Sequence, residues 1–386
     1  MDLTLTPDER RFRDEVRSWL EEHVEPVPEP GTFDEEFARG RRWQARLAAD
    51  RWVGIHWPLE AGGRGATPLE LAIFNLEYAR SRAPQPVNRT GVNLVGPTLL
   101  AHGTDAQRAR WLPGILTADD IWCQLFSEPG AGSDLAGLST RGTPVGDGWI
   151  VDGQKVWTSY AQFSRWGIAL VRTDPDASKH AGITCMAVDM QAEGLDVRPL
   201  VTMTGDAEFN EVYLDGVFVP AEQVIGGVHA GWAVANTTLA HERGTTFPFK
   251  EQVVHEVYLD EVLELAAAGD AFDDPLVADR LVDAYVSLRI LRLHNWRTMT
   301  RLGHGGEPGP ESSLVKLAWT EMTHRLSDVA LDVVGPAAPL WGSATDNPTG
   351  GKWQRQWLWS KASSIAGGTS EIQRTILGDR ILGLPR

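Results

Sequence analysis

Hydrophobic and polar positions follow a helical period over the first part of the chain. Apolar residues recur three and four positions apart behind Thr6, Thr67 and Thr104, each of which is followed three residues later by Glu or Gln. Such a pair forms a capping box, in which the two side chains satisfy unpaired N–H groups of the first helical turn. The pattern predicts a helical N-terminal domain over residues 1–118.

The period changes to alternation between residues 119 and 229. Residues 149–158 and 209–220 each alternate apolar and polar positions around an Asp-Gly pair. Because Asp-Gly favours the positive φ angles of a two-residue turn, each segment is predicted to be a β-hairpin. Residues 167–171 and 183–188 are further β-like runs, so we expect a middle domain of short antiparallel strands.

The helical period returns over residues 230–386. One predicted core stripe comprises Leu276, Leu281, Tyr285, Leu288 and Leu291. Residues 336–359 break the period and are predicted to be a long ordered loop, and a last helix is expected to begin near Thr369. This order of elements, with helices on either side of one continuous set of strands, predicts an α+β fold.

Composition and charge narrow the class of protein. The chain has 386 residues, 42% of them hydrophobic, and a formal net charge of −16, which argues against a nucleic-acid partner. No stretch of eighteen uncharged apolar residues occurs, and the start lacks the pattern of a secretory signal. Cys123 and Cys185 are too few for a disulfide scaffold or a cysteine metal cluster. We therefore predict a cytoplasmic protein with no metal site and no membrane partner.

Three segments carry the residues best suited to chemistry. Residues 124–134 form a glycine-containing loop that allows close backbone approach to a ligand, although a tight turn explains it equally well. Residues 156–159 place a Trp and two hydroxyls at a strand end, to flank a cofactor or to close the core. Residues 364–374 lead from Gly367-Gly368 into a capped helix, whose N-terminus suits a phosphate or is an ordinary helix start.

In order and spacing, these segments and residues 209–220 resemble the acyl-CoA dehydrogenases, and the resemblance covers nearly the whole chain. It implies an N-terminal helical domain (1–118), a middle β domain (119–229) and a C-terminal four-helix bundle (230–386). It also implies FAD, an acyl-CoA substrate dehydrogenated to the trans-2-enoyl-CoA, and an electron-transfer flavoprotein as acceptor. A homo- or hetero-oligomer is implied as well.

The resemblance assigns roles to individual positions. The positions that match cofactor contacts are Gln124, Phe126, Ser127, Ser133, Trp157, Thr158, Ser159, Thr369 and Glu371. The positions that match acyl-CoA contacts are Ser133, Arg243, Gly367 and Gly368.

The catalytic base implied by the resemblance has two alternative positions. Many family members place a Glu where this chain has Gly367, and others place it in a Glu-Arg pair that matches Glu242-Arg243. Removal of the α-proton of a thioester needs a positioned carboxylate, and the developing enolate needs hydrogen-bond donors. In the family the N–H at the Gly367 position is one such donor. We predict that Glu242 is the base; the alternative is an exposed helix charge beside Arg243.

Two departures from the family concern assembly. The Arg-x-x-Phe-Gly segment that reaches a neighbour's FAD is replaced here by residues 247–250, and the expected Gln and Gly-Gly loop is absent from residues 331–338. These absences predict a heteromeric complex in which a paralogous chain completes the FAD site. The alternatives are a partner subunit that has lost catalysis and a flavin oxidase or monooxygenase of the same fold.

Overall fold

The computed structural model describes residues 5–25, 32–242, 246–303, 309–341, 347 and 349–385. The chain divides into two compact units, and each is described by itself. The first unit comprises Met1–Pro26, Thr67–Ala83 and Arg243–Arg386, and the second comprises Val27–Ala66 and Pro84–Glu242.

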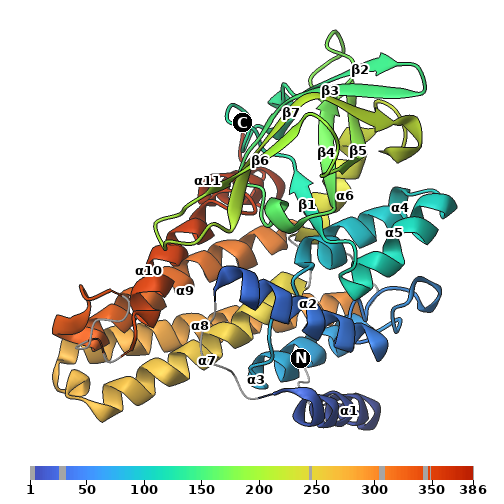
Figure 1. Ribbon diagram of the computed structural model, residues 1–386. Helices are drawn as coiled ribbons and strands as arrows, with labels where there is room; N and C mark the ends of the chain where they lie inside the picture. Colours follow the sequence, from blue (N-terminus) through green and yellow to red (C-terminus); the bar gives the residue numbers. More distant parts are fainter. Residues whose placement is uncertain are drawn as a thin grey trace. The chain divides into compact units, whose positions relative to one another are not determined.

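The second unit contains one sheet and several helices (Figure 1). The strands are β1 (Trp122–Leu125), β2 (Arg141–Val145), β3 (Gly148–Lys155), β4 (Trp166–Arg172), β5 (Ile183–Asp189), β6 (Leu195–Leu200), β7 (Phe209–Pro220) and β8 (Val224–Ile225). Their order is β6-β7-β3-β2-β4-β5-β8, with β1 paired to β4. The α-helices are α2 (Phe33–Ala49), α4 (Gly96–His102), α5 (Asp105–Thr117) and α6 (Gly231–Glu242). The predicted antiparallel sheet is confirmed for most strand pairs, but β1 and β2 each run parallel to β4.

The two Asp-Gly pairs do not form hairpin turns, so that prediction is wrong. β3 and β7 each continue through their Asp-Gly pair and lie antiparallel to one another. Val151 faces Val217 and Gly153 faces Leu214, so one residue of β3 opposes two of β7. This is a β-bulge, and the Gly216 N–H donates to Asp152 Oδ1 at 2.8 Å across it. The positive φ that Gly216 supplies serves the bulge instead of a turn.

The first unit is helical. Its α-helices are α1 (Pro7–His23), α3 (Pro68–Arg80), α7 (Thr246–Ala268), α8 (Pro275–Gly303), α9 (Glu311–Val334), α10 (Lys352–Ser360) and α11 (Ser370–Arg380). The core is built mainly from α7, α8 and α9, where Val262, Leu288 and Trp319 are buried. Within the described ranges, no helix is both long enough and apolar enough to cross a membrane.

Two expectations for the first unit need correction. Leu276 and Tyr285 are exposed, while Leu281, Leu288 and Leu291 of the same predicted stripe are buried. The predicted loop over residues 336–359 is wrong from Lys352 onward, because α10 begins there. Residues 342–346 and 348 lie outside the described residues.

Local helix signals are confirmed where they were predicted. The capping boxes at Thr6, Thr67 and Thr104 all form, with both the side chain of the threonine and that of its partner bonded to backbone N–H groups. Thr369 caps α11 by accepting from the Ile372 N–H at 3.3 Å. A fourth capping box at Thr32 begins α2; its Thr-x-x-Glu signal is present in the sequence and was missed.

Candidate active site

In the second unit, the first two predicted cofactor segments lie side by side. The chain leaves β1 through Phe126 and Ser127, and the Ser127 carbonyl accepts from the Val156 N–H at 2.9 Å. Ser127 therefore lies beside the segment that carries Trp157 and Thr158. Gln124 lies on β1 itself, partly exposed.

The segment after Val156 is held in an unusual backbone conformation. Trp157 has a φ of 60° and its side chain is 62% exposed, although Trp is a large apolar residue. The Thr158 N–H donates to the Asn210 carbonyl at 3.1 Å, and Asn210 Nδ2 donates back to the Thr158 carbonyl at 3.0 Å. Positive φ at a non-glycine residue costs free energy and persists where surrounding contacts enforce it. Here β7 supplies those contacts through Asn210.

The Thr158 hydroxyl bears on whether a polar cofactor fits beside this segment. The residue is 1% exposed, and Oγ1 has no hydrogen-bond partner among the described residues. Buried hydroxyls are normally paired, because leaving one unpaired costs about 1–3 kcal/mol. An unpaired hydroxyl next to an exposed Trp157 matches a surface that binds a planar, polar group. Ser159 follows directly and is partly exposed.

A buried ion pair between Lys155 and Glu128 holds the loop that follows β1. Lys155 Nζ donates to Glu128 Oε1 at 2.8 Å, to the Phe126 carbonyl at 3.2 Å and to the Leu170 carbonyl at 2.8 Å. The Glu128 carboxylate also accepts from the Ser139 N–H at 2.6 Å. Lys155, which lies on β3, thus links the residues after β1 to β3 and β4. The sequence does not predict this pair, because the two residues are far apart in the chain.

The charges of the pair are set by burial and by each other. Burial lowers the pKa of Lys155, and the adjacent Glu128 opposes this effect. Burial alone would raise the pKa of Glu128, but the Lys155 ammonium and several hydrogen bonds lower it to about 2. Glu128 is therefore a carboxylate at neutral pH, and its contacts hold the loop in place.

The outer part of the loop is more exposed. Ser133, predicted to contact both cofactor and substrate, lies exposed beyond the Glu128–Ala131 bridge. Its neighbour Asp134 is bound by Lys179 Nζ at 2.6 Å, which fixes this end of the loop.

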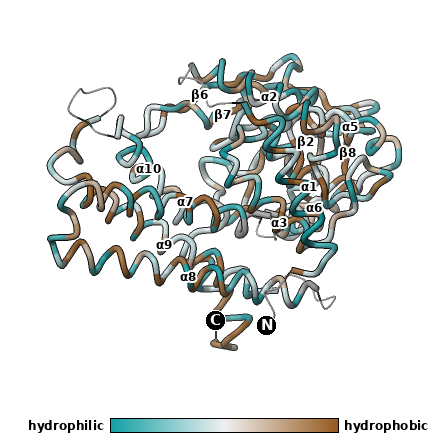
Figure 2. The backbone as a smooth tube through the Cα atoms, turned by 90° about the horizontal axis from the view of Figure 1, so that it is seen from below, coloured by the Kyte–Doolittle hydropathy of each residue, from teal (hydrophilic) through white to brown (hydrophobic). Residues whose placement is uncertain are grey.

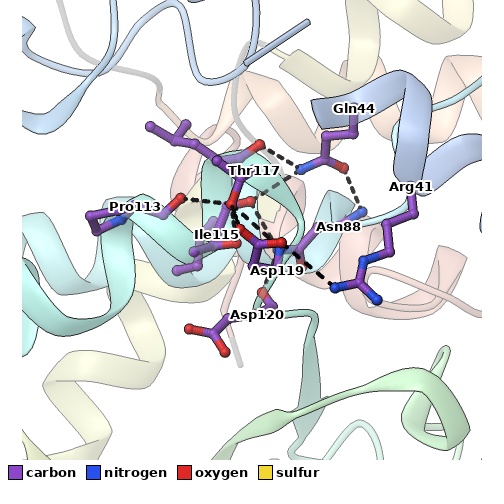
Figure 3. A network of polar contacts seen from close by, with 10 residues as sticks. Arg41, Gln44, Asn88, Pro113, Ile115, Thr117, Asp119 and Asp120 are labelled. Atoms are coloured by element: carbon purple, nitrogen blue, oxygen red, sulfur yellow. Dashed lines mark hydrogen bonds and ion pairs between the residues drawn. The ribbon is translucent and has the colours of Figure 1, made fainter. Parts of the chain in front are cut away.

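A buried amide network fixes the start of β1 (Figure 3). Asn88 Nδ2 donates to the Ile115 and Asp120 carbonyls at 3.0 and 2.8 Å. Its Oδ1 accepts from the Trp122 N–H at 3.0 Å, and its own N–H donates to Gln44 Oε1 at 2.9 Å. Because every amide group is paired, Asn88 sets where β1 begins. Asn88 and Gln44 were missed in the sequence, where nothing marks their partners.

The helix that carries the predicted base is anchored within the second unit. Thr238 Oγ1 lies 2.9 Å from Thr98 Oγ1, and Thr237 Oγ1 lies 2.8 Å from His102 Nε2. Both contacts join α6 to α4. α6 ends at Glu242, whose backbone alone is described, and Arg243 lies outside the described residues.

Two histidines, His56 and His241 near the end of α6, both have lowered pKa values, and neither is predicted from the sequence to be a catalyst. Burial lowers the pKa of His56 to about 4, with a further contribution from the charge of His241. Burial also lowers the pKa of His241. Both imidazoles are therefore neutral at pH 7, and they add no fixed cation to this region.

In the first unit, the glycine pair forms the turn that leads into α11. Gly367 and Gly368 have φ angles of 66° and 92°, a region that favours glycine. Gln373 Nε2 donates to both of their carbonyls, at 3.0 and 3.1 Å. The carbonyls are thereby tied back to the helix. The role of Gln373 was missed in the sequence, although it lies within residues 364–374.

Glu371 lies in the exposed first turn of α11. Its pKa is lowered by its own backbone N–H and by the Thr369 side chain. The structure thus places the predicted residues in two groups: Gln124, Phe126, Ser127, Ser133 and Trp157–Ser159 in the second unit, and Gly367, Gly368, Thr369 and Glu371 in the first. Among the described residues, no cluster of His, Cys, Asp and Glu is arranged to hold a metal.

The order of helical, β and helical segments along the chain is the fold of a class of flavin-dependent oxidoreductases. The chain matches the acyl-CoA dehydrogenase N-terminal domain over residues 6–119, the middle domain over 123–217 and the C-terminal domain over 229–382. It therefore belongs to the acyl-CoA dehydrogenase family, whose members are FAD-dependent oxidoreductases. The predicted three-domain fold and FAD are confirmed at this level.

Relatives extend along the whole chain. The acyl-CoA dehydrogenase IpdE1 of Mycobacterium tuberculosis is 40% identical over 98% of both chains. A solved structure titled a Tcur3481-Tcur3483 steroid ACAD is 29% identical, covers 100% of both chains and has a TM-score of 0.87. The ChsE4-ChsE5 complex from Mycobacterium tuberculosis is 32% identical, with 100% coverage of both chains and a TM-score of 0.86.

Proposed function

We propose that this chain catalyses α,β-dehydrogenation of a bulky, steroid-type acyl-CoA thioester and passes the electrons to an electron-transfer flavoprotein. Membership of the acyl-CoA dehydrogenase family supports the reaction. The substrate class is supported by the similarity to the protein titled a steroid ACAD, at 29% identity over the whole chain. It makes more specific the acyl-CoA substrate that the family resemblance alone implies.

The mechanism is supported by the position of the carboxylate: the position that holds the base in many relatives is Gly367, and a second family position holds Glu242. Gly367 occupies the position where many relatives have the base, while α6 ends on Glu242 and is anchored to α4 through Thr98 and Thr238. In this proposal Glu242 takes the α-proton of the thioester. An anchored helix suits a base, because proton abstraction depends on holding the carboxylate within hydrogen-bond reach of the proton.

The glycine turn has a second role in the proposal. The Gly367 N–H donates to the thioester carbonyl and stabilises negative charge as the α-proton leaves. Gln373 holds the neighbouring carbonyls, so the turn presents its N–H groups without rearrangement. A glycine here keeps the donor while leaving space for a wide acyl group.

The residues that would hold the cofactor are those that the family resemblance assigns. Gln124, Phe126, Ser127, Trp157, Thr158 and Ser159 would contact the flavin ring, and Thr369 and Glu371 its phosphate side. The unpaired Thr158 hydroxyl and the exposed Trp157 fit such a group. Bound FAD supplies the acceptor for the hydride from the β carbon. Ser133, Arg243 and Gly368 would contact the CoA ester.

We also propose that a paralogous chain completes the FAD site. The family segment that reaches a neighbour's FAD is absent from residues 247–250, and residues 331–338 lack the glycine-rich loop. Two similar solved structures carry two protein names in their titles, as a complex or a pair. Both observations favour a heteromeric assembly.

The test is anaerobic flavin bleaching across a panel of CoA esters. The purified assembly, with FAD bound, should bleach fastest with a steroid-type acyl-CoA and slowly with straight-chain esters. Preference for a straight chain would contradict the substrate class, and no bleaching with any ester would contradict the reaction. Reoxidation of the substrate-reduced flavin in air faster than by an electron-transfer flavoprotein would favour an oxidase instead.

A further inference from the structure

Helix α9 in the first unit carries a row of polar side chains that contact residues 357–363, at the end of α10 and in the short 3-10 turn that follows it. Polar and apolar stretches alternate along α9 in Figure 2. Side chains four residues apart are neighbours on a helix surface, so a set with this spacing forms a continuous row. This set, called the α9 polar row, comprises Lys316, Thr320, His324 and Asp328.

Two members of the α9 polar row bind the same backbone carbonyl, that of Ser363. Lys316 Nζ donates to it, and Thr320 Oγ1 donates to it at 3.0 Å. Lys316 Nζ also donates to Thr320 Oγ1 at 3.3 Å and lies 5.7 Å from the centre of the Trp319 ring. Because a carbonyl oxygen has two lone pairs, α9 supplies a donor for each of them. The Ser363 carbonyl is therefore fixed against this helix.

The other two members hold the chain just before Ser363. His324 Nε2 lies 3.0 Å from the Ser360 carbonyl oxygen and 3.2 Å from Ser363 Oγ. Asp328 Oδ1 accepts from Trp357 Nε1 at 2.7 Å. The segment is thus bound to α9 at three successive places, namely Trp357, Ser360 and Ser363.

The contacts at Ser363 are buried. Ser363 and Thr320 are 2% exposed, and Lys316 is 7% exposed. A lysine is rarely buried to this extent, because removing an ammonium from water costs free energy. An apolar side chain of similar volume is often at least as stabilising as a buried charge. The burial of Lys316 therefore indicates a role besides stability.

The carbonyl that Lys316 binds lies close in the chain to the glycine turn. Three residues separate Ser363 from Gly367. Within this stretch, the Ile365 and Ala366 N–H groups both donate to the Ala362 carbonyl, at 3.0 and 2.9 Å. Because the stretch is short and internally bonded, a displacement of the Ser363 carbonyl also displaces Gly367.

We propose that Lys316 and Thr320 are positioning residues for the Gly367 N–H, the donor to the thioester carbonyl in the function proposed above, on which this inference rests. They hold the turn on its N-terminal side, and Gln373 holds it on its C-terminal side. A donor stabilises the enolate best if it is already in place when the negative charge develops. A shift of about 1 Å in such a group can cost about 100-fold in rate.

The test measures removal of the α-proton separately from hydride transfer. It uses the FAD-containing assembly and the CoA ester that bleaches it fastest, made with sulfur in place of the β carbon. This sulfur has no hydrogen to lose as hydride, so the ester can pass its α-proton to Glu242 but cannot reduce the flavin. The enolate beside oxidised flavin absorbs at long wavelength by charge transfer, and this absorbance at saturating ester measures the deprotonated fraction.

Thr320→Val removes the hydroxyl and keeps the branched shape of the side chain. We expect it to lower the equilibrium constant for deprotonation on the order of tenfold, and Lys316→Met to lower it by about 10–100-fold. Thr320→Ser keeps the hydroxyl and should recover most of the loss. Substrate affinity and flavin content should change little in all three variants.

Thr323→Val is the matched control. Thr323 is fully buried on the same helix, and its hydroxyl contacts the Trp319 carbonyl at 2.8 Å and His255 Nε2 at 3.0 Å. The control loses a buried hydroxyl of the same kind, so it should lose stability and keep the wild-type deprotonated fraction.

The outcomes distinguish failure of the positioning role from failure of the proposed reaction. A wild type that never develops the charge-transfer band contradicts proton abstraction, and the positioning role is overturned with it. A wild type that develops the band, with an unchanged deprotonated fraction in Thr320→Val and Lys316→Met, overturns the positioning role alone. An equal loss in Thr323→Val also overturns that role, because the effect would then follow from stability in general.

Discussion

At the scale of single residues, the Glu128–Lys155 pair is the feature on which the candidate site depends most. Lys155 is fully buried and binds three acceptors, one of them the Phe126 carbonyl. Removing one partner of a buried pair leaves the other charge unpaired in an apolar interior. We expect Lys155→Met to cost about 3–5 kcal/mol of unfolding free energy.

Urea unfolding measures this cost, and the double variant Lys155→Met/Glu128→Gln is the control. It removes both charges, so it should recover part of the lost stability. Lys179→Met, which breaks the exposed pair with Asp134, should change stability by less than about 1 kcal/mol. Equal effects at the buried and the exposed lysine would contradict the role given to Lys155.

His56 gives a pH dependence whose direction follows from its burial. Its pKa falls from the ordinary 6.5 to about 4 in the folded chain, so the unfolded chain binds the proton more readily. Stability from this source is complete above pH 6.5 and is lost as the pH falls towards 4. Between pH 7.5 and 5 the loss should be about 2 kcal/mol.

The measurement compares the wild type with His56→Asn by urea unfolding at both pH values. The variant should lose less stability on acidification, by about the same 2 kcal/mol. His180, which is exposed, offers a matched control as His180→Asn, and its pH dependence should follow the wild type. A His56→Asn variant with an unchanged pH dependence would show that the imidazole is not excluded from protonation by the fold.

At the scale of elements, the turn before α11 depends on Gln373. Gln373 is buried and binds the carbonyls of Gly367 and Gly368, so Gln373→Leu should leave both unpaired and loosen the turn. We expect a loss of about 1–3 kcal/mol of stability and faster release of FAD. Gln354→Leu is the control, because Gln354 is buried in the same unit and, among the described residues, its side chain donates to the Ala337 carbonyl alone, at 3.3 Å. Flavin release that is equally fast in both variants would contradict a specific role for the turn.

The elements that the sequence predicts correctly are those specified by local contacts. The capping boxes at Thr6, Thr67 and Thr104 depend on residues three positions apart, and all three form. The Asp-Gly pairs were interpreted wrongly, because the same positive φ serves a turn or a bulge, and the strand partner decides between them. A two-residue turn forms elsewhere, where Gly146 and Asp147 join β2 to β3.

The residues of the candidate site likewise divide into those that could be assigned from the sequence and those that could not. Ser127 and the residues after Val156 were assigned by family resemblance, and the structure places them side by side. Their supports, Asn88 and Lys155, were not found, because their partners come from distant parts of the chain. A single sequence carries no signal for such pairings.

At the scale of the whole molecule, we expect flavin binding to depend on a second chain. Expressed alone, this chain should retain little FAD, because residues 247–250 and 331–338 lack the family's contacts to the adenosine half. Co-expression with a paralogous chain should raise the ratio of FAD to protein towards its full value. The measurement is flavin absorbance against protein concentration after gel filtration. A stable assembly of this chain alone with one FAD per copy would overturn the prediction.

The proposed role of Glu242 as the base is tested most directly by anaerobic stopped-flow reduction of the flavin in Glu242→Gln. The amide keeps the size of the side chain and cannot accept a proton, so bleaching by the best CoA ester should slow by about 10²–10⁴-fold. Flavin content and substrate binding should persist, and Glu193→Gln, at an exposed position in the second unit, should match the wild type. A Glu242→Gln variant that bleaches within a few-fold of the wild-type rate would place the base elsewhere and contradict the mechanism.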